Sequence, residues 1–163
     1  MFSFLKKSKE GKSMILKSPV VGRCFDISEI PDEVFSSKML GNGIGFESTE
    51  GVLYAPVDGE ILQIFPTKHA LILKSKEGIE ILLHIGIDTV EMKGEGFEAF
   101  AQKGQQVKAG DKLLTFNNEL IKAKAKTNLS VLVLTDNEIM ESVEFKLGNV
   151  DKNDEVITIK IKK

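Results

Sequence analysis

The chain contains two histidines, His69 and His84, and both border a pattern typical of a β-hairpin. An apolar run follows His69, another precedes His84, and Lys74–Gly78 between the two runs is polar and ends in glycine. A two-residue loop at the centre would place the histidines directly opposite each other on one face. A three-residue loop with Gly78 at a bulge would shift them to a diagonal that two imidazoles still span. We therefore expect the two rings to meet.

Two imidazoles in contact support two kinds of chemistry. One ring can act as a nucleophile that accepts a phosphoryl group, while the other donates a hydrogen bond to the phosphoryl oxygens. Alternatively, two histidines with Asp88 or Asp32 would supply the three protein ligands of a catalytic zinc. The sequence has no His-x-His or His-Glu-x-x-His spacing and no cysteine pair, so resident zinc is the weaker interpretation. It also has no Gly-x-Ser-x-Gly motif for a serine hydrolase and no P-loop for a nucleotide.

The residues near each histidine favour a functional pair over two unrelated core side chains. Gly86 allows a close approach by backbone or ligand, and its carbonyl is close enough in sequence to fix one ring nitrogen of His84. Asp88 adds a carboxylate nearby. Thr67 lies two residues before His69, on the same face if the strand extends that far, so its hydroxyl can set the tautomer of that ring.

Composition narrows the class of protein. The chain has 163 residues, 42% of them hydrophobic and 28% charged, with a net charge of −2, as expected for one soluble globular domain. There is no basic excess that would indicate nucleic-acid binding, and no apolar stretch approaches the roughly 18–20 residues that span a bilayer. Cys24 is the single cysteine and cannot form an internal disulfide, which favours the cytoplasm. We expect a flexible tail over residues 1–13, with peripheral membrane contact at most, and one domain over residues 14–163.

Short β segments separated by glycine and proline fill most of the chain and favour an all-β sandwich or barrel. The segment that starts at Ser18 resembles the one that starts at Ala55, which suggests two related β units. The predicted strands are Met14–Leu16, Val20–Asp26, Ile44–Ser48, Val52–Tyr54, Gly59–Phe65, His69–Lys74, Gly78–Ile85, Gln106–Val107, Lys112–Phe116, Val131–Leu134 and Val156–Lys160. Short helical stretches are predicted at Pro31–Ser37, Phe97–Ala101, Asn118–Ala123 and Asn137–Glu141.

The segment Gly78–Val90 resembles the phosphorylation-site signature of the glucose-type enzyme IIA proteins, which belong to the bacterial phosphoenolpyruvate-dependent sugar phosphotransferase system. The similarity extends over nearly the whole chain, roughly from Met14 to Lys163. Further matching segments are Glu91–Phe97, Ala55–Gly59, Thr67–Ala70, Ile30–Phe35 and Gly41–Gly43.

This resemblance implies an antiparallel β-sandwich or barrel-sandwich built from a duplicated motif, with a few short surface helices. It also implies a phosphotransferase component in which Nε2 of His84 accepts a phosphoryl group from phospho-HPr and passes it to a IIB domain of a glucose-type sugar permease. The carbonyl of Gly86 would hold Nδ1 of His84. His69 would stabilise the phosphoryl oxygens, and Thr67 would orient His69.

The resemblance also implies a docking surface around the histidines. Asp32 and Asp88 would meet basic groups of the partners, HPr and the IIB/IIC permease domains. The expected apolar contacts are Val34, Phe35, Met39, Leu40, Phe65 and Val90. No cofactor is required, although some relatives bind zinc at the histidine pair in complexes, and some bind regulated permeases or glycerol kinase. The alternative functions are a biotinyl- or lipoyl-like carrier, whose Ala-Met-Lys-Met motif is absent, and a metal-binding β module.

Overall fold

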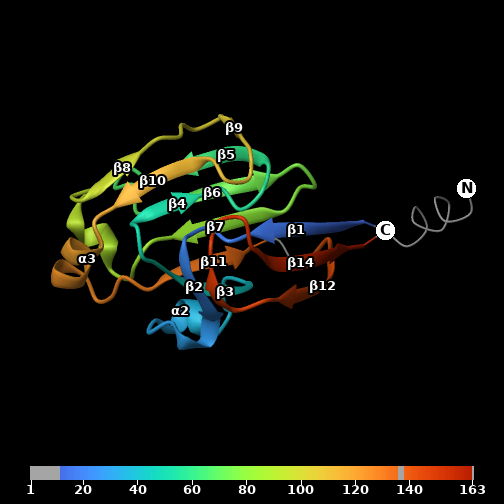
Figure 1. Ribbon diagram of the computed structural model, residues 1–163, viewed down its shortest axis with the longest axis horizontal. Helices are drawn as coiled ribbons and strands as arrows, with labels where there is room; N and C mark the ends of the chain where they lie inside the picture. The colour runs from blue at the N-terminus through green and yellow to red at the C-terminus, as the bar shows by residue number, and fades with distance from the viewer. Residues whose placement is uncertain (1–11, 136–137, 163) are drawn as a thin grey trace, which may run out of the picture.

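A computed structural model describes residues 12–135 and 138–162. The strands are β1 (Ser13–Lys17), β2 (Gly22–Asp26), β3 (Asn42–Ser48), β4 (Val52–Tyr54), β5 (Gly59–Ile64), β6 (Ala70–Ser75), β7 (Glu80–His84), β8 (Phe97–Ala99), β9 (Gln106–Val107), β10 (Lys112–Phe116), β11 (Ser130–Leu134), β12 (Met140–Phe145), β13 (Gly148–Val150) and β14 (Glu155–Ile161). They form an eight-stranded sheet, β13-β2-β3-β11-β7-β6-β5-β9, and two three-stranded sheets, β1-β14-β12 and β4-β10-β8 (Figure 1). All described strand pairs are antiparallel and form no closed barrel, so the predicted all-β antiparallel class is confirmed.

The helices of the described residues are short and lie on the surface of the sheets (Figure 1). They are the 3₁₀ helices η1 (Ile27–Glu29) and η2 (Thr89–Met92) and the α-helices α2 (Glu33–Ser36) and α3 (Asn118–Lys124). Asp32 caps α2 by accepting a hydrogen bond from the N–H of Val34 at 2.9 Å. Asn117 caps α3 through the N–H of Leu120 at 3.1 Å. Both α-helices lie where the sequence predicts them, and no helix in the described part of the chain is long and apolar enough to span a membrane.

The sequence predicts helical turns at Phe97–Ala101 and Asn137–Glu141, and the structure corrects both. The first segment contains β8, which pairs with β10 and buries the side chain of Phe97. In the second, residues 136–137 lie outside the described residues, and Met140 begins β12, which pairs with β14. Pairing with a neighbouring strand outweighs the local preference of such short segments. The predicted tail also lies outside the described residues, except at its end, where Ser13 begins β1.

The two similar proline-containing segments of the sequence occupy equivalent places in a duplicated unit. The N–H of Lys17 donates to the carbonyl of Pro56 at 2.8 Å, and the N–H of Tyr54 donates to the carbonyl of Pro19 at 2.7 Å. The strand order repeats as well: β13-β2-β3-β11 on one side of the large sheet corresponds to β9-β5-β6-β7 on the other. The motif predicted from the sequence therefore occurs twice.

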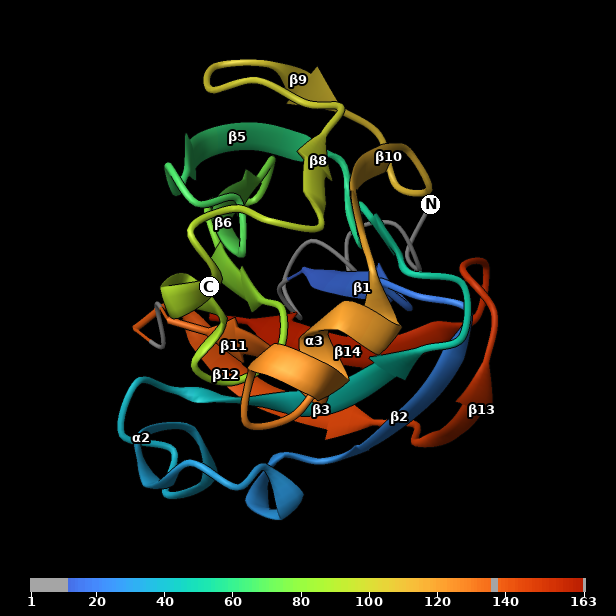
Figure 2. The ribbon, with the colours of Figure 1, turned by 90° about the vertical axis from the view of Figure 1, so that its left-hand side faces the viewer.

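The two copies are nested rather than consecutive. We call β4–β10 the inner unit, and β1–β3 together with β11–β14 the outer unit, because the chain completes the first between two parts of the second. In Figure 2, β5, β8, β9 and β10 of the inner unit lie above β2, β3, β12 and β13 of the outer unit. The units meet at the centre of the large sheet, where β7 pairs with β11.

Apolar side chains cover both faces of β11, the central strand, so its whole length is buried. Leu132 belongs to the main core between the sheets. Val131 and Val133 point to the opposite face and join a second cluster beneath η1 and α2. Phe35 of α2 belongs to this second cluster and contacts the ring of His84. Burial of the second cluster therefore fixes α2 over the face of the sheet that carries His84.

Candidate functional site

The β6–β7 hairpin brings the two histidines together. Ala70 pairs with His84, and the carbonyl of His69 accepts a hydrogen bond from the N–H of Ile85 at 2.8 Å. The loop ends in Gly78 at φ 97°, so the shifted pairing is confirmed and the direct opposition of the histidines is wrong. The ring centroids are nevertheless 5.0 Å apart, with an angle of 81° between the ring planes.

A backbone carbonyl fixes the tautomer of His84. Its Nδ1 lies 2.9 Å from the carbonyl oxygen of Gly86. Because a carbonyl can only accept, Nδ1 carries the proton and Nε2 keeps a lone pair. Gly86 has φ 67°, and a Cβ there would lie 2.6 Å from Cγ2 of Thr89. Only glycine therefore fits the turn that aims this carbonyl at the ring.

His69 has a different partner. The ring is 4% exposed, and its Nδ1 lies 2.5 Å from Oγ1 of Thr67. Thr67 lies in the turn between β5 and β6 rather than on an extended strand, so the contact forms without the strand extension that the sequence suggested. Phe65 packs on the imidazole of His69 edge to face, with ring centroids 5.5 Å apart. The hydroxyl and the phenyl ring together hold the position of His69.

Burial keeps both imidazoles neutral near pH 7. It lowers the pKa of His84 from 6.5 to about 4, and the neighbouring His69 lowers this pKa further as a competing cation. The hydrogen bond to Gly86 and the carboxylates of Asp32 and Asp88 act in the opposite direction and raise the pKa of His84. Burial also lowers the pKa of His69. A neutral ring with a free lone pair is the form that can act as a nucleophile.

The predicted docking residues lie in three segments of the chain: around α2, in the connection between β5 and β6, and at η2. Asp32 is half-buried before α2, and Asp88 is exposed in a left-handed conformation before η2. Phe35 is buried, with its ring centroid 5.1 Å from that of His84, so it forms part of the core as well as of the site. Phe65 is half-buried. The exposed apolar side chains are Val34 (42% exposed), Met39 (72%), Leu40 (43%) and Val90 (52%).

Two buried side chains that the sequence reasoning did not select hold the turn at Gly86. The hydroxyl of Ser130 accepts a hydrogen bond from the N–H of Gly86 at 3.0 Å. Thr89 donates to the carbonyl of Ile85 at 2.6 Å. The signal for Ser130 was a single serine at the start of the apolar run Ser130–Leu134. That signal is weak, because only the three-dimensional structure places β11 beside the end of β7.

The zinc interpretation required a third ligand from Asp32 or Asp88. Among the residues that the structure describes, no group of three or more histidine, cysteine, aspartate or glutamate side chains is placed to hold a metal ion.

Comparison with known proteins identifies close relatives. A family model described as "phosphoenolpyruvate-dependent sugar phosphotransferase system, EIIA 1" matches residues 14–140. The "PTS system glucose-specific EIIA component" of Bacillus cereus is 48% identical over 141 residues, which cover 86% of this chain and 85% of the relative. A protein of the same description from Staphylococcus epidermidis is 39% identical over 143 residues, which cover 88% of this chain and 86% of the relative.

A solved structure described as "glucose permease IIA from Mycoplasma capricolum" has the same fold. Its TM-score is 0.86 at 38% sequence identity, and the match covers 91% of this chain and 96% of that chain. These similarities support a phosphocarrier and do not support the biotinyl- or lipoyl-like carrier or the metal-binding module. The protein therefore belongs to the EIIA 1 family of the phosphoenolpyruvate-dependent sugar phosphotransferase system and is a phosphotransferase component.

Proposed function

We propose that His84 accepts a phosphoryl group at Nε2 from the phosphohistidine of HPr and passes it to a IIB domain. As a member of its family, the protein exchanges phosphoryl groups with HPr and IIB partners. The observation that carries the assignment to His84 is the contact of 2.9 Å between its Nδ1 and the carbonyl of Gly86. It leaves the lone pair of Nε2 free to form a new N–P bond while the N–P bond of the donor breaks. In the second transfer, the phosphoryl group leaves Nε2 for a cysteine of the IIB domain.

His69 stabilises the transferred group. Phosphoryl transfer depends mainly on positioning and on stabilising the charge of the equatorial oxygens. If the hydroxyl of Thr67 donates to Nδ1 of His69, the proton of that ring is on Nε2, where it can donate to a phosphoryl oxygen. The distance of 5.0 Å between the ring centroids of the two histidines supports this role. The lowered pKa of His69, which keeps the ring neutral, supports it as well.

Asp32 and Asp88 act on the bound phosphoryl group and on the partners. The group brings roughly −1.5 to −2 charges to the site. Both carboxylates interact with His84 strongly enough to raise its pKa, so they would repel the phosphoryl group and keep it ready for onward transfer. The same carboxylates are available to basic side chains of HPr and IIB. The apolar contacts come from Val34, Phe35, Met39, Leu40, Phe65 and Val90.

The wider setting follows from the relatives and the chemistry of the pair. The names of the relatives favour a glucose-type permease with IIB/IIC domains as the acceptor. Cys24 is a free buried thiol, which fits a cytoplasmic protein. Zinc at His69 and His84 would need further ligands from a partner, such as a regulated permease or glycerol kinase. Transfer itself requires no cofactor, and contact with the membrane would be peripheral.

The test is phosphorylation by phosphoenolpyruvate, enzyme I and HPr, with wild type compared with His84→Ala and His69→Ala. We expect no phosphate on His84→Ala, because the accepting nitrogen is lost. His69→Ala should accept phosphate but transfer it poorly to IIB, because the donor to the phosphoryl oxygens is lost. Phosphate on His84→Ala at the wild-type rate would overturn the assignment.

A further inference from the structure

A series of hydrogen-bonded residues begins at the proposed phosphoryl acceptor and runs away from it. Nδ1 of His84 donates to the carbonyl of Gly86, and the N–H of the same glycine donates to Oγ of Ser130 at 3.0 Å. Oγ of Ser130 then donates to the carbonyl of Asn128 at 3.0 Å. Ser130 is 1% exposed, so its hydroxyl is shielded from solvent.

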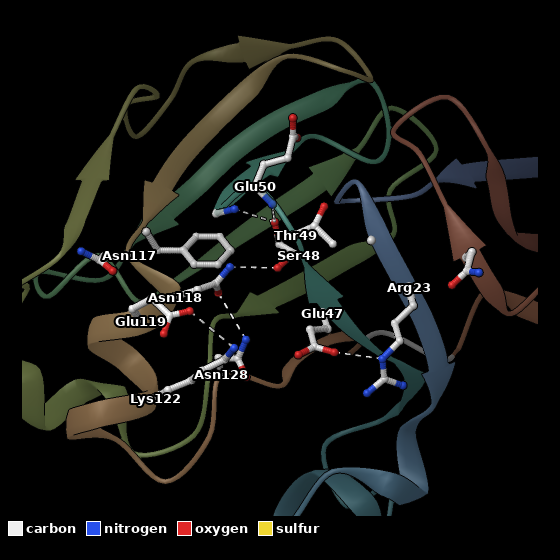
Figure 3. A pocket seen from close by; sticks show the side chains of 14 residues that line it. Arg23, Glu47, Ser48, Thr49, Glu50, Asn117, Asn118, Glu119, Lys122 and Asn128 are labelled. Carbon is white, nitrogen blue, oxygen red and sulfur yellow. Dashed lines mark hydrogen bonds and ion pairs between the residues drawn. The ribbon is translucent and has the colours of Figure 1, made fainter.

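The series continues to a polar pocket beside the β3–β4 turn (Figure 3). Nδ2 of Asn128 donates to Oδ1 of Asn118 at 3.3 Å, and Nδ2 of Asn118 donates to the carbonyl of Ser48 at 2.9 Å. The pocket has a volume of about 610 Å³ and is lined by these three residues, among others. Along the series each residue donates to the next one farther from His84.

We propose that Ser130 is a positioning residue for phosphoryl transfer, an inference that rests on His84 as the acceptor. The N–H of Gly86 belongs to the peptide group that it shares with Ile85, whereas the carbonyl of Gly86 belongs to the next peptide group along the chain. The α-carbon of Gly86 joins these two planar groups. By holding the first peptide group in place, Ser130 limits rotation at Gly86, which has φ 67° and no side chain to restrict it, and so fixes the direction in which the Gly86 carbonyl points.

This arrangement matters most when His84 carries the phosphoryl group. With Nε2 phosphorylated, the imidazole holds its remaining proton on Nδ1 and gains positive charge. A charge-assisted hydrogen bond to a well-oriented carbonyl is roughly twice as strong as a neutral one. Ser130 therefore supports both the free tautomer that presents Nε2 and the phosphorylated ring.

Removing the hydroxyl should disturb this geometry specifically. In Ser130→Ala the buried N–H of Gly86 loses its partner, which favours rotation of the Ile85–Gly86 peptide group toward another acceptor. Such a rotation changes the backbone angles at Gly86 and turns its carbonyl away from His84. The matched control is Ser75→Ala. Ser75 is likewise buried, and its Oγ accepts the N–H of Ile79 at 3.0 Å, but it lies at the far end of the β6–β7 hairpin from the histidines.

Two measurements test the proposal. The first is the ¹⁵N–¹H spectrum of the histidine rings in the unphosphorylated protein, which reports the tautomer of His84. The second is steady-state transfer from phospho-HPr, separated into kcat and KM. For Ser130→Ala we expect a mixture of tautomers and a loss of about tenfold in kcat with unchanged KM, because docking is untouched. Ser75→Ala should match wild type in both, and Ser130→Cys, which nearly keeps the volume and a weak donor, should fall between.

A wild-type tautomer and kcat in Ser130→Ala would overturn the proposal. Equal losses in Ser75→Ala would also overturn it, since the effect would then belong to any buried serine. Should Ser130→Ala fail to fold, Ser130→Cys carries the same test through its intermediate values. Phosphate on His84→Ala would contradict the proposed function itself. The effect of Ser130→Ala on the tautomer of His84 would still test the positioning role of Ser130 separately.

Discussion

The inner and outer units share one backbone plan, yet only the inner unit contains histidine. Gly59 pairs with Ser75 at one end of β5 and β6, and Gly22 pairs with Ser48 at the same end of β2 and β3. The hydroxyls of Ser75 and Ser48 both accept backbone N–H groups of the turn that follows. From these matching pairs, each position of one unit can be assigned to a position of the other.

By this register, His84 corresponds to Val133 and His69 corresponds to Asn42. Val133 is fully buried, whereas His84 is only partly buried. Asn42 uses its side chain locally, accepting the N–H of Gly43 at 2.9 Å. Duplication has therefore provided two equivalent pairs of positions in the scaffold, and histidines occupy only one of these pairs.

The connections explain how the difference is maintained. The connection between β5 and β6 spans residues 65–69, whereas that between β2 and β3 spans residues 27–41 and contains η1 and α2. The longer connection covers Val133, and through Phe35 it reaches the ring of His84. One unit thus supplies the imidazoles, and the other supplies apolar cover for His84, whose burial lowers its pKa.

The largest effect on phosphorylation is expected when His84 is replaced by valine, the residue at the equivalent position of the outer unit. His84→Val should abolish phosphorylation by phospho-HPr completely, because valine has no nucleophile. It should still fold, because valine occupies the equivalent position in β11. Transfer of radioactive phosphate and thermal unfolding would measure the two properties. A variant that unfolds would show that the two positions are not interchangeable even as scaffold.

Removing the ring of Phe35, which covers His84, should destabilise the fold. Phe35→Ala deletes a buried ring that packs on His84 and on the second cluster, and it should cost about 3 kcal/mol of unfolding free energy. Urea denaturation measures this loss. Phe35→Leu is the control and should lose less, because it leaves a smaller cavity. A loss below about 0.5 kcal/mol for Phe35→Ala would mean that packing of α2 on the sheet contributes little to the stability of the fold.

Lowering the pH should decrease the stability of the fold through protonation of His84. The pKa of His84 is about 4 in the folded protein and about 6.5 when unfolded. Between these two pH values His84 binds a proton in the unfolded chain but not in the folded one. The free energy of unfolding is therefore highest above pH 6.5 and decreases as the pH falls toward 4. From pH 7 to pH 5, wild type should lose about 2 kcal/mol more than His84→Val. Equal acid sensitivity in urea denaturation would contradict this.

The second exchange between the units should have a smaller effect. His69→Asn places the outer residue beside His84 and keeps an N–H donor, but it changes the donor's position. We expect phosphate to be accepted and onward transfer to IIB to slow by about tenfold, comparable to losing one hydrogen bond in the transition state. Single-turnover transfer from the phosphorylated protein measures this step. A wild-type rate would show that His69 does not contact the phosphoryl oxygens.

The smallest effect concerns the exposed rim. Asp88→Asn removes a negative charge near His84 and should lengthen the lifetime of the phosphorylated protein by about threefold, since exposed charges interact weakly. Glu144→Gln, an exposed change on β12, is the control and should leave the lifetime unchanged. Hydrolysis followed over time compares the two. An unchanged lifetime in Asp88→Asn would remove the electrostatic role.

The sequence predicted the parts of the site that local rules determine. The spacing of the two histidines and Gly78 at the turn predicted the hairpin, and Gly86 predicted the carbonyl that binds His84. The register between β6 and β7 depends on the length of the loop that joins them, and the sequence alone left that length open. The contact of Phe35 with His84 could not be predicted from local rules, because it depends on how a long connection folds over a sheet.

The same limit applies to the support behind the site and to part of the fold. Ser130 acts on Gly86 only because β11, distant in the chain, pairs with β7. The helix predicted at Phe97–Ala101 was wrong for a similar reason, since β10 supplies the hydrogen bonds that make the segment a strand. Local propensity carries no information about a partner strand elsewhere in the sequence.

Nesting of one unit inside the other sets the order in which the protein can be completed during translation. β3 emerges from the ribosome long before β11, the strand that joins it to β7, and all of β4–β10 is made in between. The histidine-bearing strands can therefore pair with each other while the sheet beside them is still unfinished. Domains rich in such distant contacts fold slowly. The edge of β3 that pairs with β11 stays unpaired until β11 arrives, and an unpaired strand edge is a site for aggregation.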